Sequence, residues 1–152
     1  MRRSILTILA GVIVGGIVVG LIEIPSNRMH PLPPDTDMKD WDAIKRHAAK
    51  APTAALLGVA IAWTVGPAMG AFVAAVIACE GQLFHGEIIG VVFLAMDLAM
   101  ISSLPHPMWL IVVGMIGPLF GGWIGAILGR RFAPGATSSP RPSDMRAKNV
   151  AC

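Results

Sequence analysis

Four long apolar segments dominate this chain of 152 residues. They cover positions 4–24, 53–79, 87–104 and 107–129. A helix that crosses the roughly 30 Å hydrocarbon core of a bilayer needs about 20 apolar residues, and each segment is near that length. Because lipid offers no hydrogen-bond partners, a spanning segment satisfies its backbone internally as a helix. The sequence therefore predicts an all-α fold, a four-helix transmembrane bundle that forms a membrane domain at 1–132.

Composition supports lipid, rather than a protein core, as the surroundings of these segments. Of all residues 55% are hydrophobic and 14% are charged, whereas soluble domains average about 25% charged residues. No basic patch interleaved with aromatic residues is present, so nucleic acid is not an expected partner. The expected partners are membrane lipid and either other membrane-protein subunits or further copies of this chain.

Basic residues near the segment ends predict the orientation. Arginine pairs stand at positions 2–3 and 130–131, whereas residues 80–86 contain no lysine or arginine. The 25–52 loop does hold five basic residues, so the bias is not complete. Cytoplasmic flanks of spanning helices carry an excess of Lys and Arg. The pairs therefore predict that both termini are cytoplasmic, and the first segment is expected to be retained as a signal anchor.

Two of the segments share a pattern without gaps. Residues 65–78 read VGPAMGAFVAAVIA, and residues 116–129 read IGPLFGGWIGAILG. One interpretation is two parallel-repeat hairpins, related by a pseudo-twofold axis along the membrane normal, as in some transporter families. The other is that glycine-rich apolar helices simply look alike in composition.

Small residues recur at every fourth position of the same two segments. Lipid tails are as apolar as leucine, so membrane helices associate by close packing, which small side chains permit. We expect these glycines to pack helices within the bundle, or else one stripe to dock another protein. The candidates for helix packing are Gly58, Gly66, Gly70, Gly117, Gly121 and Gly125.

Two further segments lie outside the apolar ones. Residues 35–50 predict a short amphipathic helix, with Met38, Trp41 and Ile44 on one face. It is expected to lie on the periplasmic surface or to cover the outer mouth of the bundle. Residues 133–152 are rich in Pro, Ser and Arg, a composition typical of a cytoplasmic tail without a packed core.

Asp97 interrupts the third segment near the expected bilayer midplane. A carboxylate there costs about 2.5–3.5 kcal/mol on insertion scales, so such residues are functional candidates by default. Asp97 is a candidate proton relay, cation site or partner contact. The alternative is a protonated side chain that hydrogen-bonds to Thr64 or Ser102. No second carboxylate is expected at its depth, which disfavours transport.

Glu23, His30 and His106 are expected near the periplasmic ends of the first and third segments. Two histidines and a carboxylate resemble a transition-metal ligand set. However, no closely spaced pair of ligands exists, and both histidines precede prolines in turns. We therefore expect hydrogen bonding at the membrane interface, with no metal and no cofactor. No catalytic motif appears, so no enzyme is predicted.

Short segments along residues 5–129 carry a resemblance. They read Leu21-Ile22-Glu23, His30-Pro31, PTAALLGV at 52–59 with Ala62-Trp63, and LPHPMW at 104–109. In these segments the chain resembles a loosely defined group of small four-helix bacterial inner-membrane proteins of unassigned activity. The resemblance implies four spanning helices and a bacterial inner membrane, and it brings no functional residues with it.

These observations leave three hypotheses. The leading one is a non-enzymatic accessory or scaffold subunit of a larger inner-membrane complex, which docks through small-residue helix faces and its tail. The alternative is a small transporter or channel that uses Asp97 at a pseudo-twofold repeat. A third is a periplasmic metal or ligand sensor built on Glu23, His30 and His106.

Overall fold

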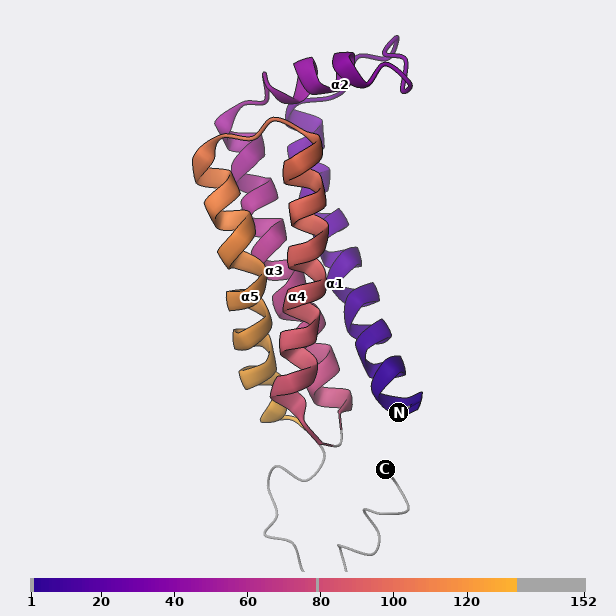
Figure 1. The fold of residues 1–152 in the computed structure, drawn as a ribbon, viewed down its shortest axis with the longest axis vertical. Helices are drawn as coiled ribbons and strands as arrows, with labels where there is room; N and C mark the ends of the chain where they lie inside the picture. Colours follow the sequence, from indigo (N-terminus) through magenta and orange to yellow (C-terminus); the bar gives the residue numbers. More distant parts are fainter. Residues whose placement is uncertain (1, 79, 134–152) are drawn as a thin grey trace, which may run out of the picture.

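The computed structural model of the protein describes residues 2–78 and 80–133. Over these residues the chain is all-helical, with five helices and no strand. Apart from Ala133, the predicted tail at 133–152 lies outside the described residues. The helices, shown in Figure 1, are α1 (Arg2–Met29), α2 (Trp41–Ala48), α3 (Thr53–Ile77), α4 (Gln82–Ser103) and α5 (Met108–Arg130).

Four of the helices, α1, α3, α4 and α5, are long and apolar enough to cross a membrane. Many of their large apolar side chains are exposed and not buried in a core. Hydrocarbon surroundings accept such side chains, whereas water would not. The prediction of an all-α, four-helix transmembrane bundle is confirmed, and with it that of a multi-pass membrane protein.

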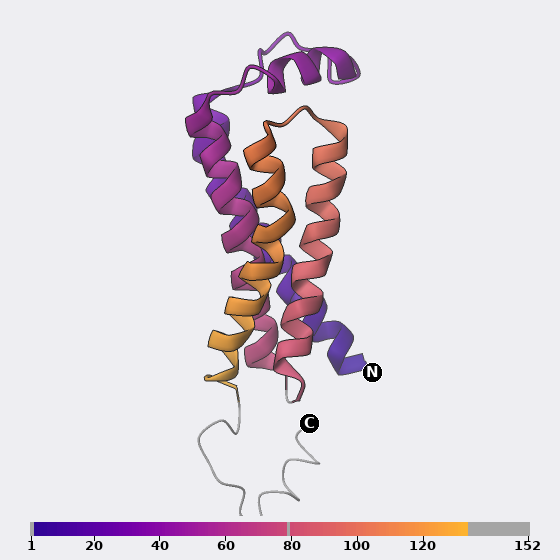
Figure 2. The same cartoon turned by 60° about the vertical axis from the view of Figure 1, so that its left-hand side comes forward.

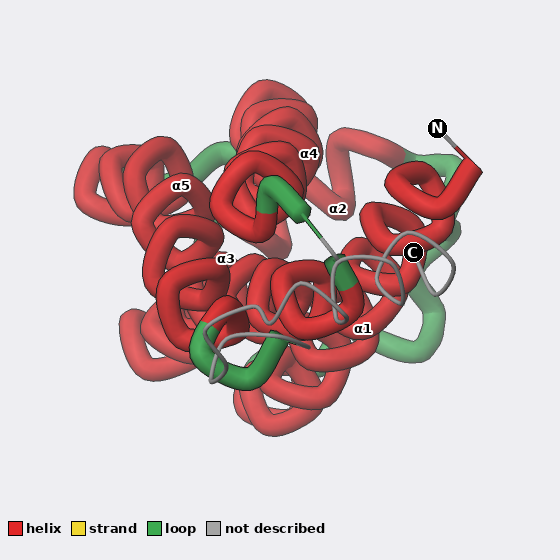
Figure 3. The backbone as a smooth tube through the Cα atoms, turned by 90° about the horizontal axis from the view of Figure 1, so that it is seen from below, coloured by secondary structure: helices red, strands yellow, loops and turns green. Residues whose placement is uncertain are grey.

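The helix α3 lies between α1 and α5 (Figure 3). The helix α4 packs against α3 and α5 and also touches α1, whereas α1 and α5 do not meet anywhere in the described part of the chain. Figures 1 and 2 show that α1 and α4 run in one direction and α3 and α5 in the other. The start of α1 and the end of α5 therefore share one end of the bundle. The short helix α2 lies across the opposite end, called here the α2 end (Figure 1).

The helix α1 ends later than the sequence predicted. The prediction placed its end at residue 24, before Pro25, but the helix continues to Met29. The N–H of His30 still donates to the Ser26 carbonyl oxygen, at 3.2 Å. A proline removes one backbone hydrogen bond from a helix, and membrane helices tolerate this where neighbouring groups compensate. Polar residues that were expected in a loop therefore lie on a regular helix.

Two other helices start at residues that differ from the prediction. The helix α2 was predicted at 35–50 but begins at Trp41, because the Asp40 carboxylate caps it by accepting the Ala43 N–H at 2.9 Å. The helix α4 was predicted from residue 87 but begins directly after Gly81. The φ of 63° at Gly81 lies in the left-handed region that glycine adopts without strain. This turn lets α4 begin before the apolar segment does.

Glycines lie where α1 and α3 approach each other most closely. A Cβ atom on Gly11 would lie 2.8 Å from the carbonyl oxygen of Gly70, and one on Gly15 would lie 2.9 Å from that of Gly66. Real Cβ atoms essentially never come so close to a backbone oxygen. Any larger residue would therefore push the two helices apart at this contact.

The contact between α3 and α5 has the same character. A Cβ atom on Gly117 would lie 2.7 Å from the Thr64 hydroxyl oxygen. One on Gly121 or Gly125 would overlap the backbone carbonyl oxygen of Thr64 or Ala68. The glycines of α5 are thus occupied inside the bundle and do not form a free face.

The repeat between residues 65–78 and 116–129 does not produce equivalent contacts. Gly66 of α3 faces α1, but its counterpart in the repeat, Gly117 of α5, faces α3. In addition, α3 contacts α4, whereas α5 and α1 do not touch within the described ranges. The predicted twofold relation therefore fails for these contacts. The physical reason is that α3 occupies the centre, so both of its faces are engaged, while α5 lies on one side.

Candidate functional site

The last two turns of α1 carry a polar stripe on one face. Glu23, Ser26, Asn27 and His30 follow the spacing i, i+3, i+4 and i+7, which places them one above another on a helix. All four line a cavity of about 230 Å³ at the α2 end of the bundle. We call this cavity the polar chamber.

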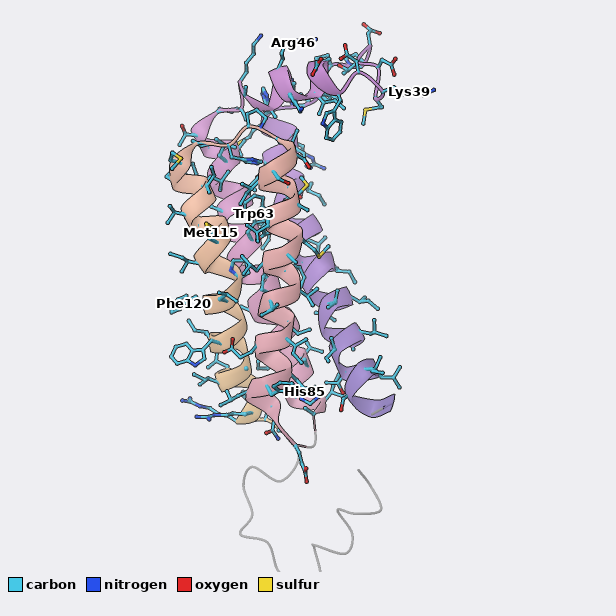
Figure 4. The ribbon with its side chains drawn as sticks, in the orientation of Figure 1. Lys39, Arg46, Trp63, His85, Met115 and Phe120 are labelled. Atoms are coloured by element: carbon cyan, nitrogen blue, oxygen red, sulfur yellow. The ribbon has the colours of Figure 1, made fainter. Side chains whose placement is uncertain are left out.

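The other walls of the polar chamber come from the remaining elements. His47 is contributed by α2, and His106 by the connection between α4 and α5. Leu56 and Trp63 of α3 and Met100 of α4 supply an apolar side. The side chain of Trp63 points into the bundle in Figure 4, whereas Lys39 and Arg46 lie on the outer side of the α2 region. The chamber is thus polar on its α1 side and apolar on the side of α3 and α4.

A pair of histidines fastens α2 over the polar chamber. The rings of His30 and His47 stack with their centroids 3.9 Å apart and an interplanar angle of 12°. The Nε2 atom of His30 is 3.0 Å from the His47 carbonyl oxygen, and that of His47 is 3.4 Å from the His30 carbonyl oxygen. A carbonyl only accepts, so each ring donates through Nε2–H. These reciprocal contacts tie the end of α1 to α2.

His106 is held separately from the other two histidines. Its Nδ1 atom lies 2.8 Å from the Leu104 carbonyl oxygen, to which it donates. Its ring centroid is 5.7 Å from that of Trp63. Within the described part of the chain, no three His, Cys, Asp or Glu side chains are close enough to hold a metal ion. The structure therefore brings Glu23, His30 and His106 around one cavity without making them a metal-ligand set.

Asp97 of α4 is buried, with 4% of its surface exposed, and its Oδ2 atom has no hydrogen-bond partner among the described residues. Neither hydrogen bond predicted for it is formed. The Thr64 hydroxyl donates to the Ala60 carbonyl oxygen at 3.1 Å, and the Ser102 hydroxyl donates to that of Ala99 at 2.9 Å. Hydroxyl groups in helices often turn back to a carbonyl of their own preceding turn.

The structure corrects the expected depth of Asp97 and its isolation. Asp97 lies in the last third of α4 (Gln82–Ser103), toward the α2 end, and not at the middle of the span. Glu23 lies in the last third of α1 (Arg2–Met29), which runs in the same direction. The helices α1 and α4 contact each other, so the two carboxyl groups lie toward the same end of neighbouring helices. A second carboxyl group toward the same end of the bundle as Asp97 was not expected from the sequence.

Ser26 is the second buried polar residue of this region without a partner. It is 4% exposed, and its Oγ atom makes no hydrogen bond within the described residues. It packs against Gly58 of α3, where an added Cβ atom would overlap the Ser26 hydroxyl oxygen. Gly58 thus leaves room for the hydroxyl group of Ser26, a residue that lines the polar chamber.

Sequence reasoning missed Ser26, Asn27 and His47. The signal for the first two was the helical spacing of the polar residues from Glu23 to His30, which becomes visible once the helix is continued through Pro25. His47 carried no comparable signal, because its place beside α1 depends on how α2 folds back over the bundle. Comparison of the chain with known protein families, curated proteins and solved structures finds no match.

Proposed function

We propose that this protein is a small transporter or channel for a cation, and that Glu23 and Asp97 bind the cation between α1 and α4. Two ionised carboxylates repel each other, and burial away from water disfavours the charged form of each. A proton or another cation shared by the pair lowers both costs. The polar chamber brings the side chains of Glu23, Asn27 and three histidines to the α2 end.

The observation that carries this proposal is the buried Asp97 Oδ2 atom, which has no partner among the described residues and lies on a helix that contacts α1, the helix of Glu23. A buried polar group left without a hydrogen bond costs about 1–3 kcal/mol. An aspartate with a purely structural role is expected to direct both oxygens at donors. Ionisable groups within membrane spans commonly mark ion and proton pathways.

The arginines at 130–131 support an orientation with both termini in the cytoplasm, under the rule that cytoplasmic flanks are basic. In a bacterial inner membrane, the polar chamber would then face the periplasm. Cations would enter the site from that side.

The proposal predicts cation flux that depends on Asp97. Full-length protein in liposomes that contain dyes sensitive to pH, Na⁺ or K⁺ is exposed to gradients of Na⁺, K⁺ and small ammonium ions, with protein-free liposomes as the baseline. We expect the wild type to move cations or protons. Asp97→Asn and Glu23→Gln should each lower the rate at least about tenfold, equivalent to roughly 1.4 kcal/mol of lost interaction with the ion.

Glu87→Gln is the matched control, because Glu87 lies near the opposite end of α4 from Asp97. This variant should keep the flux of the wild type. Equal rates in the wild type and Asp97→Asn, or no flux in the wild type for any of these ions, would exclude the proposed function.

The role as an accessory or scaffold subunit stays a prediction. Leucine at Gly121 or Gly125 would disrupt the bundle, so it does not test docking. Gly16 and Gly20 of α1 are better sites, because a Cβ atom at either would meet nothing within 4 Å. Leucine at both should release any partner in mild detergent without unfolding the protein. If the wild-type protein never co-purifies with a partner, this prediction is wrong.

A further inference from the structure

The polar chamber has two chemically different sides. Its α1 side presents the stripe from Glu23 to His30, and its opposite side presents aliphatic and aromatic groups of α3 and α4. An inorganic ion makes no favourable contact with the apolar side. A ligand that is charged at one end and hydrocarbon at the other fits both sides, since apolar surface gains by leaving water.

The charge that lines the polar chamber selects the sign of the ligand. Among the described residues that line it, Glu23 is the only acidic side chain, and no lysine or arginine is present. The cationic side chain of Arg46 is turned to the outside of α2, where it lies 3.7 Å from the Asp40 carboxylate. The chamber therefore favours cations and disfavours anions.

Two further features point to a ligand with an N–H donor and a compact positive charge. Ser26 is one of the residues that line the chamber, and its hydroxyl oxygen is buried with no hydrogen-bond partner in the described structure. It is a ready acceptor one turn from Glu23. The indole of Trp63 also lines the chamber, and the face of a tryptophan attracts cations through its ring electrons.

The volume limits the size of the ligand. The polar chamber measures about 230 Å³, below the roughly 300–1,000 Å³ of pockets that hold drug-sized molecules. It is also several times the roughly 30 Å³ that one water molecule occupies. A ligand of a few heavy atoms is the appropriate size.

From these features we infer that the polar chamber binds a small organic ammonium ion. Its charged nitrogen donates to the Glu23 carboxylate and the Ser26 hydroxyl, and its short hydrocarbon part lies against Leu56 and Met100. This inference rests on the proposed function, because it names the class of cation that the site at Glu23 and Asp97 receives.

The test uses Trp63 as a reporter of binding. The chain has four tryptophans, and replacing Trp41, Trp109 and Trp123 with phenylalanine leaves Trp63 as the only indole. The full-length variant in lipid nanodiscs is titrated with butylammonium chloride. 1-Butanol and sodium butyrate, which share the hydrocarbon chain, serve as uncharged and anionic controls. Calorimetric titration of the wild type with butylammonium provides a second measurement that does not depend on the substitutions.

We expect a saturable change in Trp63 fluorescence with butylammonium and none with butanol or butyrate. Glu23→Gln should weaken binding at least about tenfold, as for hydrogen bonds to charged groups, and Ser26→Ala about three- to tenfold, as for a typical hydrogen bond. Glu87→Gln should bind as the wild type does. No saturable binding of butylammonium in both measurements, or affinity unchanged in Glu23→Gln, would overturn the inference.

Different experimental results would overturn this inference and the proposed function. If Na⁺ or K⁺ flux depends on Asp97 but butylammonium does not bind, the ammonium inference is overturned and the proposed function stands. If butylammonium binds through Glu23 but no cation crosses the membrane, the inferred ligand class is supported and transport is excluded.

Discussion

The residues of greatest interest are those that the packing leaves without partners. Asp97 and Ser26 are each 4% exposed, and each has an oxygen without a donor or acceptor in the described structure. The hydroxyl groups of Thr64 and Ser102, by contrast, donate to carbonyl oxygens of their own helices. A single polar side chain can be satisfied locally within a helix, and where it is not, a ligand can supply the partner.

At this scale we predict that Asp97→Asn stabilises the protein while it removes cation flux. A neutral amide avoids both the repulsion from Glu23 and the cost of a buried charge, so stability should rise on the order of 1 kcal/mol. Thermal unfolding in detergent micelles measures this change, with Glu87→Gln as the control. A lower melting temperature for Asp97→Asn would show that the carboxyl group holds the fold together, and would contradict a functional role.

At the scale of the helices, most of the fold was predictable and most of the site was not. The four spans follow from the length and apolar character of their segments, because lipid forces such segments into helices. The end of α1 was not predictable from hydropathy, since the residues after Glu23 are polar and include Pro25. The pairing of Glu23 with Asp97 depends on the register between α1 and α4, which no pattern within a single segment specifies.

The glycine contacts provide a prediction for the helices. Gly125→Ala places a methyl group against the Ala68 backbone and should lower stability by about 1–3 kcal/mol, as overpacked cores do. Gly16→Ala meets open space and should be neutral or stabilising by up to about 1 kcal/mol, because alanine favours helix more than glycine does. Thermal unfolding in the same detergent compares them. Equal losses of stability in Gly125→Ala and Gly16→Ala would contradict the glycine contacts described for α5 and α1.

The whole molecule is an asymmetric bundle. The helix α3 is central, α1 and α5 flank it, and α2 lies across one end only (Figure 1). The sequence repeat therefore marks two helices, α3 and α5, that are similar in composition but pack against different neighbours. This asymmetry also places α2 and the polar stripe of α1 together at one end.

The whole-molecule arrangement predicts that α2 and the end of α5 are reached from opposite faces of the membrane. Cys79 and Cys152 are first replaced by serine. Asp42→Cys in α2 and Arg131→Cys after α5 are then treated with a membrane-impermeant thiol reagent in intact cells. Under the proposed orientation, only Asp42→Cys should react before the membrane is opened. Labelling of both positions from one side would contradict the four-span arrangement.

The connection between α1 and α2 has a consequence for how the protein can be assembled. Residues 31–40 are largely exposed, and their backbone hydrogen bonds are local turns such as that from Thr36 to Pro33. The helix α1 is therefore joined to the rest by lateral packing on α3 and α4 and by the contact between His30 and His47. A gene divided within this stretch should yield two polypeptides that associate in the bilayer. The first helix could then be replaced by one that is supplied as a separate chain.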